Sequence, residues 1–167
     1  DTITPIVTCP ADQTDFLDAS CEFRALDYST LVTGVDNCGG SVFFTQTPSV
    51  NTLFTGTNSP IVITYSAEDA LGNTSTCNFN VNISDTIAPI IAGCAPDTII
   101  SADANCEYIM EDFTGFISAI DNCSTATGES QNVAIGTALA AGGPYPVVLS
   151  IMDDSSNTST CTFNIMV

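Results

Sequence analysis

Residues 61–83 read IVITYSAEDALGNTSTCNFNVNI, and the alternation within this stretch decides the fold class. Every second residue of 78–83 is apolar, which is the period of a β-strand with one buried face and one exposed face. Residues 60–67 show the same alternation. Between the two runs, residues 69–73 are rich in turn-forming residues and include Gly72. The stretch therefore predicts an antiparallel β-hairpin.

The same pattern returns later in the chain. A second alternating run, 145–152, is followed by a turn-rich segment, 153–157, and the words of 73–77 recur at 157–161 as Asn-Thr-Ser-Thr-Cys. Corresponding cysteines are 85, 85, 85 and 84 residues apart. An internal period of this length indicates two copies of one structural unit. We expect module 1 at residues 1–84 and module 2 at residues 85–167, excerpted from a longer array.

The cysteines form a repeated set of four, which is typical of disulfides rather than of reactive or metal-bound thiols. Zinc is the competing interpretation, but the chain has no histidine and no Cys-x-x-Cys pair. We therefore expect a secreted, extracellular or cell-surface protein. The eight cysteines are Cys9, Cys21, Cys38, Cys77, Cys94, Cys106, Cys123 and Cys161.

The charge balance excludes several classes of partner. The chain has one cationic side chain, Arg24, against 19 acidic residues, and its net charge is −18. Binding to nucleic acid or insertion into a membrane is not expected of such a surface. With 44% hydrophobic residues, the chain nevertheless has enough apolar surface to fold.

Short strands separated by turn residues predict an all-β fold. Each module of about 85 residues is expected to be an immunoglobulin-like antiparallel β-sandwich of roughly seven strands, stabilised by two disulfides. Short helical turns are expected only within 28–35 and 113–120. Further runs expected as strands are Ile6–Cys9, Cys21–Leu26, Ser41–Thr47, Ile90–Cys94, Cys106–Met110 and Gln131–Ile135.

The expected strand order also predicts the disulfide pairing. Cys9 and Cys21 flank the loop between the first two expected strands. Cys38 begins the third expected strand and Cys77 the last, both at the other end of the sandwich. The predicted pairs are therefore Cys9–Cys21 and Cys38–Cys77, with Cys94–Cys106 and Cys123–Cys161 following from the repeat.

Both modules resemble the hyalin repeat (HYR) modules. The resemblance lies in Asp-x-x-x-Pro followed by Cys, in Asp-Asn-Cys at mid-module, and in the closing pattern of residues 69–81; in module 2, Asp154 and Ser156 depart from that pattern. Such modules are similar to those in sea-urchin hyalin and in tandem-repeat surface proteins and gliding adhesins of Bacteroidota. The resemblance implies an immunoglobulin-like fold and an adhesive or spacer role.

Three classes of function are open. A stalk or filament building block needs only tandem modules, which would contact each other and identical chains. An adhesin would bind a glycan or protein receptor through exposed aromatic residues, for which Phe43, Phe44, Phe54 and Tyr145 are the candidates. Enzymes are disfavoured because His and Lys are absent, which leaves only neighbouring carboxylates such as Glu68–Asp69, Glu111–Asp112 and Asp153–Asp154. We therefore expect no catalytic residue and no bound organic cofactor.

Two kinds of glycosylation are hypotheses from sequence. Asn-x-Ser/Thr triplets occur at Asn73, Asn82, Asn122 and Asn157. Asp-Thr-Ile triplets, which resemble the O-glycan sites of Bacteroidota, occur at Thr2, Thr86 and Thr98.

The junction between the modules, residues 82–89, contains no glycine and includes Pro89. A short link of this composition predicts that the modules are held end to end as a semi-rigid rod.

Acidic residues distant in sequence are expected to converge at the ends of the modules. Carboxylate and amide oxygens, with no nitrogen or sulfur ligand at hand, favour Ca²⁺ over a transition metal. The alternative is that aspartates such as Asp36 and Asp69 cap turns through their side chains. Candidate calcium ligands are Asp85, Asp121, Asp153, Asp154 and Asn157 in module 2 and Asp1, Asp36, Asp69 and Asn73 in module 1, with Asp12, Asp15 and Asp18 in a loop expected to face the junction.

Overall fold

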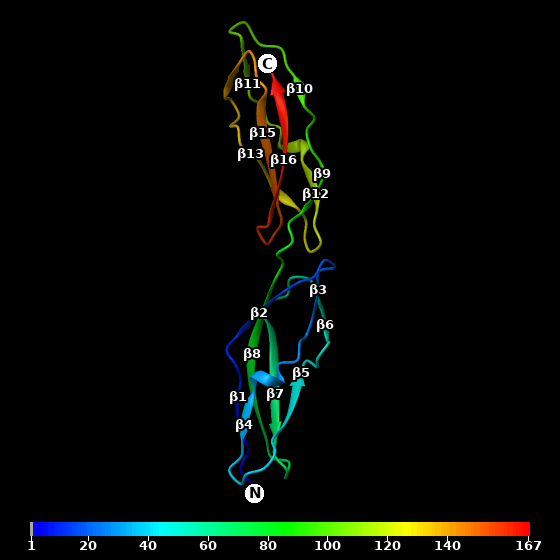
Figure 1. Ribbon diagram of the computed structural model, residues 1–167, viewed down its shortest axis with the longest axis vertical. Coiled ribbons are helices and arrows are strands. Elements are labelled where there is room, and N and C mark those ends of the chain that lie inside the picture. Colours follow the sequence, from blue (N-terminus) through cyan, green and yellow to red (C-terminus); the bar gives the residue numbers. More distant parts are fainter. Residues whose placement is uncertain (1) are drawn as a thin grey trace. The chain divides into compact units, whose positions relative to one another are not determined.

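The computed structural model describes residues 2–167, which divide into two compact units: unit 1, up to Asp85, and unit 2, residues 86–167 (Figure 1). Both units are built from β-strands with one short 3-10 turn each, so the all-β prediction is confirmed. Over residues 2–167 no helix has the length and apolar character needed to cross a membrane.

The strands repeat in the same order in the two units. Unit 1 contains β1 (Ile6–Thr8), β2 (Gln13–Phe16), β3 (Glu22–Arg24), η1 (Ser29–Leu31), β4 (Thr33–Val35), β5 (Phe43–Thr47), β6 (Leu53–Thr55), β7 (Ile61–Glu68) and β8 (Thr74–Ser84). Unit 2 contains β9 (Ile90–Gly93), β10 (Thr98–Ile99), β11 (Glu107–Ile109), η2 (Thr114–Phe116), β12 (Ser118–Ile120), β13 (Thr127–Gln131), β14 (Ala138–Ala140), β15 (Tyr145–Met152) and β16 (Thr158–Met166).

The predicted hairpin lies at the centre of each unit. Strands β7 and β8 pair antiparallel in the four-stranded sheet β2-β8-β7-β5, and β15 and β16 do so in the sheet β10-β16-β15-β13. The first strand of each of these sheets, β2 or β10, runs parallel to the last. Two-stranded sheets complete each unit: β1-β4 and β3-β6 in unit 1, and β9-β12 and β11-β14 in unit 2.

The core of each unit contains the inward-facing side chains of its hairpin. Along β7, burial alternates residue by residue, as the sequence pattern predicts. The rings of Tyr28 and Phe79 meet edge to face with centroids 5.3 Å apart, and those of Phe113 and Phe163 lie 5.1 Å apart. The residues before each 3-10 turn are thereby anchored on the last strand.

A glutamine on the edge strand fixes this turn segment through hydrogen bonds. Gln46 Nε2 donates to the carbonyl oxygens of Leu26 and Pro48, at 2.9 and 3.1 Å, while its Oε1 accepts from the Tyr65 hydroxyl at 2.6 Å. Gln131 makes the corresponding backbone contacts in unit 2. Neither glutamine is predictable from the sequence, because a single polar residue in an alternating strand looks like a solvent-facing position.

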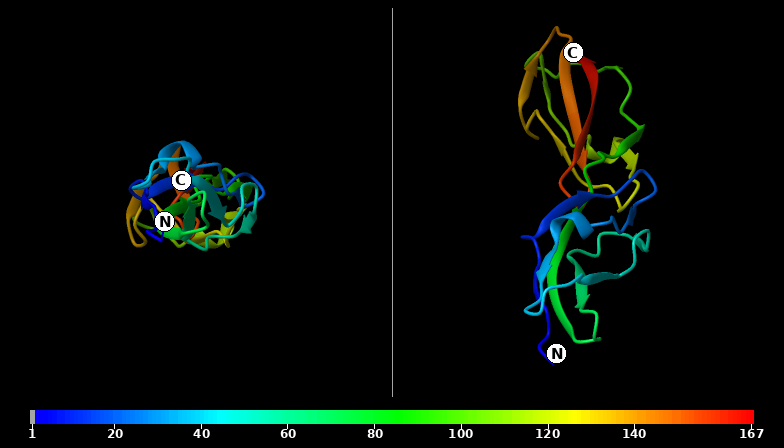
Figure 2. Two further views of the ribbon diagram at one scale, coloured as in Figure 1. Left: turned by 90° about the horizontal axis from the view of Figure 1, so that it is seen from below. Right: turned by 60° about the horizontal axis from the view of Figure 1, so that its bottom comes forward.

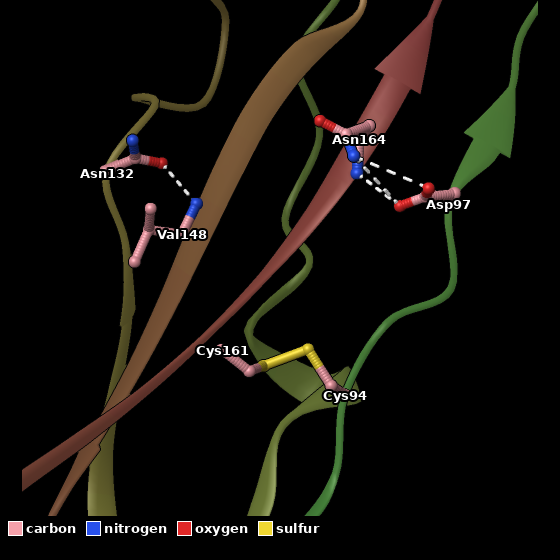
Figure 3. The surroundings of a disulfide bond; sticks show 6 residues. All are labelled: Cys94, Asp97, Asn132, Val148, Cys161 and Asn164. Carbon is pink, nitrogen blue, oxygen red and sulfur yellow. Dashed lines mark hydrogen bonds between the residues drawn. A yellow bond between two sulfur atoms is a disulfide. The ribbon is translucent and has the colours of Figure 1, made fainter.

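The expected strand at 131–135 is wrong. Strand β13 ends at Gln131, because the side chain of the next residue replaces the backbone as acceptor: Asn132 Oδ1 accepts the Val148 N–H at 2.8 Å (Figure 3). Six further strands, of two to four residues each, were not expected from the sequence, because they have too few positions for a period to be visible: β2, β4, β6, β10, β12 and β14.

All four predicted disulfide pairs are wrong. Cys9 is bonded to Cys77, and Cys94 is bonded to Cys161 (Figure 3). The predictions Cys9–Cys21, Cys38–Cys77, Cys94–Cys106 and Cys123–Cys161 assumed that one loop joins the first two strands, whereas β2 and β10 lie inside that segment and pair with the last strand.

The register of the parallel strands explains the observed bonds. Gln13 lies opposite Val81, an offset of 68 residues, and Cys9 and Cys77 are separated by the same 68 residues. In unit 2, Thr98 lies opposite Ile165, and the offset of 67 residues is again that of the disulfide. Each bond therefore continues the pairing of the parallel strand toward the start of the unit.

The disulfide of unit 1 should contribute strongly to stability. Closing a segment of 68 residues is worth about 4 kcal/mol on the loop-entropy estimate. We expect the double variant Cys9→Ser/Cys77→Ser to lose stability of this order, measured as a lower urea midpoint for one of the two unfolding transitions.

The matched control is Cys38→Ser, since Cys38 is a free cysteine. Its urea midpoint should equal that of the wild type. A loss as large as that of the double variant would instead favour the Cys38–Cys77 pairing.

Candidate metal centre

Three carboxylates come together at the N-terminal end of the second repeat. Asp85 precedes β9, Asp121 follows β12 and Asp153 follows β15, and one carboxylate oxygen of each lies within 4.8 Å of the others. Asp85 and Asp153 are each only 3% exposed. This convergence of three distant segments is the one that the sequence predicted for module 2.

Asp153 is positioned by the turn that it begins. Its Oδ1 accepts the backbone N–H of Asn157 and its Oδ2 accepts the Asn157 side-chain amide, both at 2.8 Å. Its own N–H donates to the Asn157 carbonyl at 3.0 Å. The turn therefore holds the carboxylate inward, and Asn157 acts as the partner that orients it.

Asp121 is positioned by the Asp-Asn-Cys segment. Its Oδ2 accepts the backbone N–H groups of Cys123 and Ser124, at 2.9 and 3.0 Å. Its Oδ1 is buried and accepts no hydrogen bond from the described residues. A buried carboxylate oxygen without a donor, beside two further carboxylates, suits a hard cation such as Ca²⁺.

Asp154 does not belong to this cluster. Its side chain is exposed, and its backbone N–H donates to Ser124 Oγ at 3.3 Å. Adjacent positions of a turn cannot both face inward here, because Asp153 fills the inward position. Because Asp153 faces inward and Asp154 is exposed, the two carboxylates are not placed to act as a catalytic pair.

In module 1 the described members of the predicted set lie near one another. Asp36 and Asp69 line one pocket together with Leu71, and the predicted ligand Asp1 lies outside the described residues. Asp69 Oδ1 accepts the N–H groups of Leu71 and Asn73, at 2.8 and 2.9 Å, and its Oδ2 accepts the Asn73 side-chain amide at 2.8 Å. The Asn73 amide and these backbone donors hold the pKa of Asp69 below its ordinary value. Asp69 therefore caps its turn through its side chain, as the alternative prediction proposed.

The loop acids of module 1 have hydrogen-bond partners within the module. Asp12 accepts the backbone N–H of Asn80 at 2.8 Å and its side-chain amide at 3.0 Å. Asp15 accepts the N–H of the residue that follows it, and Asp18 accepts those of Ser20 and Glu22. These bonds give each of the three a structural role.

The candidate receptor-binding aromatics differ in exposure. Phe43 is 63% exposed. Phe44 lies against Gly34, the Phe54 ring lies 6.3 Å from that of Phe23, and the Tyr145 hydroxyl donates to a backbone carbonyl at 3.0 Å. Each of the last three therefore has a packing role.

The sequence-predicted glycosylation positions differ in accessibility. Asn82, Thr2 and Thr86 are exposed, while Thr98 is half-buried. The amides of all four asparagines donate hydrogen bonds: Asn73 to Asp69, Asn157 to Asp153, Asn122 to Cys123 Sγ, and the exposed Asn82 to the Gln13 carbonyl at 3.4 Å. Glycosylation stays a prediction, with its accessible positions now distinguished.

No protein-family model matches the sequence, so the HYR resemblance stays a prediction. The structure is similar to the protocadherin GammaB4 extracellular domain, with a TM-score of 0.42, 15% identity, and coverage of 98% of this chain and 32% of that one. It is similar to the human mucin-like protocadherin EC1-2 fragment, with a TM-score of 0.40, 13% identity, and coverage of 98% and 97%. An I-band fragment of titin gives a TM-score of 0.45, 12% identity, and coverage of 100% and 66%. The chain spans about a third of the first of these. Similarities at this level assign neither family nor ligand.

The bond between Asp12 and Asn80 predicts a pH dependence. The Asn80 backbone N–H, followed by its side-chain amide, lowers the pKa of Asp12 below the ordinary 3.8. A depressed folded-state pKa contributes stability above the unfolded value, and that contribution is lost as the pH falls through the folded value. We expect Asp12→Ala to lower the melting temperature at pH 7, and the difference from wild type to narrow at pH values below 3.8.

The control for this variant is Glu68→Ala, which removes the same charge from an exposed position. It should leave the melting temperature near that of the wild type at both pH values. Equal effects of the two substitutions would mean that net charge, rather than the Asn80 contact, is responsible.

Proposed function

We propose that the chain is a non-catalytic structural repeat of an extracellular or cell-surface protein, and that its modules act as semi-rigid units of a stalk or fibre. The observation that carries this proposal is the path of the chain, which enters and leaves each unit at opposite ends of its long last strand. A spacer needs this property, because every module then adds length.

In unit 1 both ends of the path are fixed by hydrogen bonds. Ser75 Oγ, at the start of β8, donates to the Pro5 carbonyl at 2.5 Å, and the segment before β1 lies beside the β7–β8 turn (Figure 2). The chain leaves at Ser84, the end of β8, whose carbonyl accepts the Leu17 N–H at 3.1 Å. The 11 residues of β8 span about 36 Å at the usual rise of a strand.

Unit 2 repeats the arrangement. Ser159 Oγ donates to the Pro89 carbonyl at 2.5 Å near the start of β16. At the other end, Val167 and Gly142 exchange two backbone hydrogen bonds, of 2.7 and 2.9 Å. The serine-to-proline anchor is the same in both units, and although the far end is held by different backbone hydrogen bonds in each, the chain enters and leaves both units at opposite ends of the last strand.

The chemistry of the chain supports the other parts of the proposal. Two disulfides clamp the first strands onto the last ones, and such bonds persist in oxidising compartments outside the cytosol. The sequence offers no histidine or lysine for a nucleophilic or acid–base device. The adhesin alternative has weaker support, since of its four candidate aromatics only Phe43 is widely exposed.

Small-angle scattering tests the stalk role. If the modules are held end to end, the pair should have a maximum dimension of at least about 65 Å, because the last strands of 11 and 9 residues span roughly 36 and 30 Å. A pair folded back on itself would have a maximum dimension close to that of one module, and that result would contradict the proposal.

We also propose that the cluster of Asp85, Asp121 and Asp153 binds Ca²⁺. The three carboxylates supply hard oxygen ligands, and Ca²⁺ accepts six to eight such ligands with flexible geometry. Three buried or half-buried carboxylates within 4.8 Å repel one another unless a cation neutralises them. The ion would stabilise the folded module in proportion to its binding free energy.

Asp121→Asn is the sharpest variant for testing the ion. The asparagine oxygen can still accept the backbone N–H groups that Asp121 accepts, while one negative charge leaves the cluster. We expect the variant to melt above wild type in chelator and to lose the rise in melting temperature that wild type shows with calcium. Titration calorimetry should give binding heat for wild type and none for the variant.

The matched control is Asp154→Asn, one residue from the cluster but exposed. It should retain the full calcium response. An identical wild-type melting temperature in calcium and in chelator, with no binding heat, would remove the metal and leave these aspartates as turn residues.

A further inference from the structure

Two cysteines, Cys38 and Cys106, are free and exposed. Their counterparts in the other repeat are not free: Cys123, the counterpart of Cys38, and Cys21, the counterpart of Cys106, are both disulfide-bonded. We propose that Cys106 of one copy of the chain forms a disulfide with Cys38 of a second copy, and that this bond joins copies head to tail.

The free thiol of Cys38 is held as its bonded counterpart is held. The Asp-Asn-Cys segments 36–38 and 121–123 make the same contacts: the aspartate Oδ2 accepts the cysteine N–H at 3.0 and 2.9 Å, respectively. In both, the asparagine Nδ2 donates to the cysteine Sγ, at 3.3 and 3.1 Å. Segment 36–38 thus makes the same contacts as segment 121–123, although Cys38 is free and Cys123 is disulfide-bonded.

The same is true of Cys106. It ends the turn 103–106 with a φ of 61°, and Cys21 ends the turn 18–21 with a φ of 58°. In both turns the cysteine N–H donates to the carbonyl of the aspartate three residues earlier, at 3.1 and 2.9 Å. A left-handed backbone at a residue that is not glycine is uncommon, so its repetition shows that one turn design serves both modules.

Cys38 and Cys106 lie at opposite ends of their modules. Cys38 lines the pocket at the N-terminal end of unit 1 beside Leu71 of the β7–β8 turn. Cys106 lies at the C-terminal end of unit 2, where its carbonyl accepts the Ala141 N–H at 2.8 Å and the neighbouring Gly142 pairs with Val167. A head-to-tail contact between copies brings such ends together, and a contact of two different surfaces can propagate into a fibre.

The bond requires an oxidant, which we take to be a small disulfide such as oxidised glutathione. The Cys38 thiolate attacks one sulfur of the oxidant and releases one glutathione thiolate. The Cys106 thiolate of a second copy then attacks Cys38 Sγ and releases the other glutathione. Two thiols lose two protons and two electrons, and one glutathione disulfide becomes two glutathione thiols.

The variants Cys38→Ser and Cys106→Ser test the pairing, because each leaves one of the two free thiols. Incubated with oxidised and reduced glutathione in physiological salt, wild type should give a ladder of covalent oligomers on a non-reducing gel. Each variant alone should stay monomeric, and an equimolar mixture of the two should stop at the dimer. Salt is needed to screen the charge of −18 on each copy.

Peptide mapping without reduction identifies the bond. Cleavage before aspartate places every cysteine in its own peptide, so a Cys38–Cys106 bond should join peptides 36–68 and 103–111. Monomers capped only by glutathione, or dimers formed equally by either variant alone, would overturn the proposal. Neither result would affect the stalk role, which scattering from the single chain tests.

Discussion

The structure of each module depends on the attachment of its first strands to its last one. In unit 1 the disulfide Cys9–Cys77, the contact of Asp12 with Asn80 and the parallel pairing of β2 with β8 all have the same offset of 68 residues. Unit 2 has the equivalent set at an offset of 67 residues, and Figure 3 shows its disulfide beside the contact of Asp97 with Asn164. In each unit, the register of the parallel edge strand on the last strand is therefore shared by the disulfide, the Asp–Asn contact and the backbone pairing.

This attachment makes a small all-β module workable as a spacer. A module of this size buries a limited core, and its first strand would otherwise be a free segment at the sheet edge. The disulfide holds the start of the module against the last strand, beside the parallel edge strand β2 or β10.

The ends of the modules have a different chemistry from the middle. They contain the buried carboxylates of Asp85, Asp121 and Asp153 and the exposed thiols of Cys38 and Cys106. The Asp-Asn-Cys segments of the two modules have different parts in these proposals: Asp121 of segment 121–123 would bind the ion, whereas Cys38 of segment 36–38 would form the bond. The two proposals rest on different observations and are tested separately.

The sequence alone determined the all-β class, the two-fold repeat and the central hairpin. Alternation is visible within a short segment, and the 85-residue period is visible when the sequence is aligned with itself. It also brought Asp85, Asp121 and Asp153 together, since each follows or precedes an expected strand at one end of the unit. Only the tertiary structure decided the disulfide pairing. That pairing depends on the short strands β2 and β10, whose two to four residues have no visible period and gain their order only by adding to the edge of a sheet that is already formed.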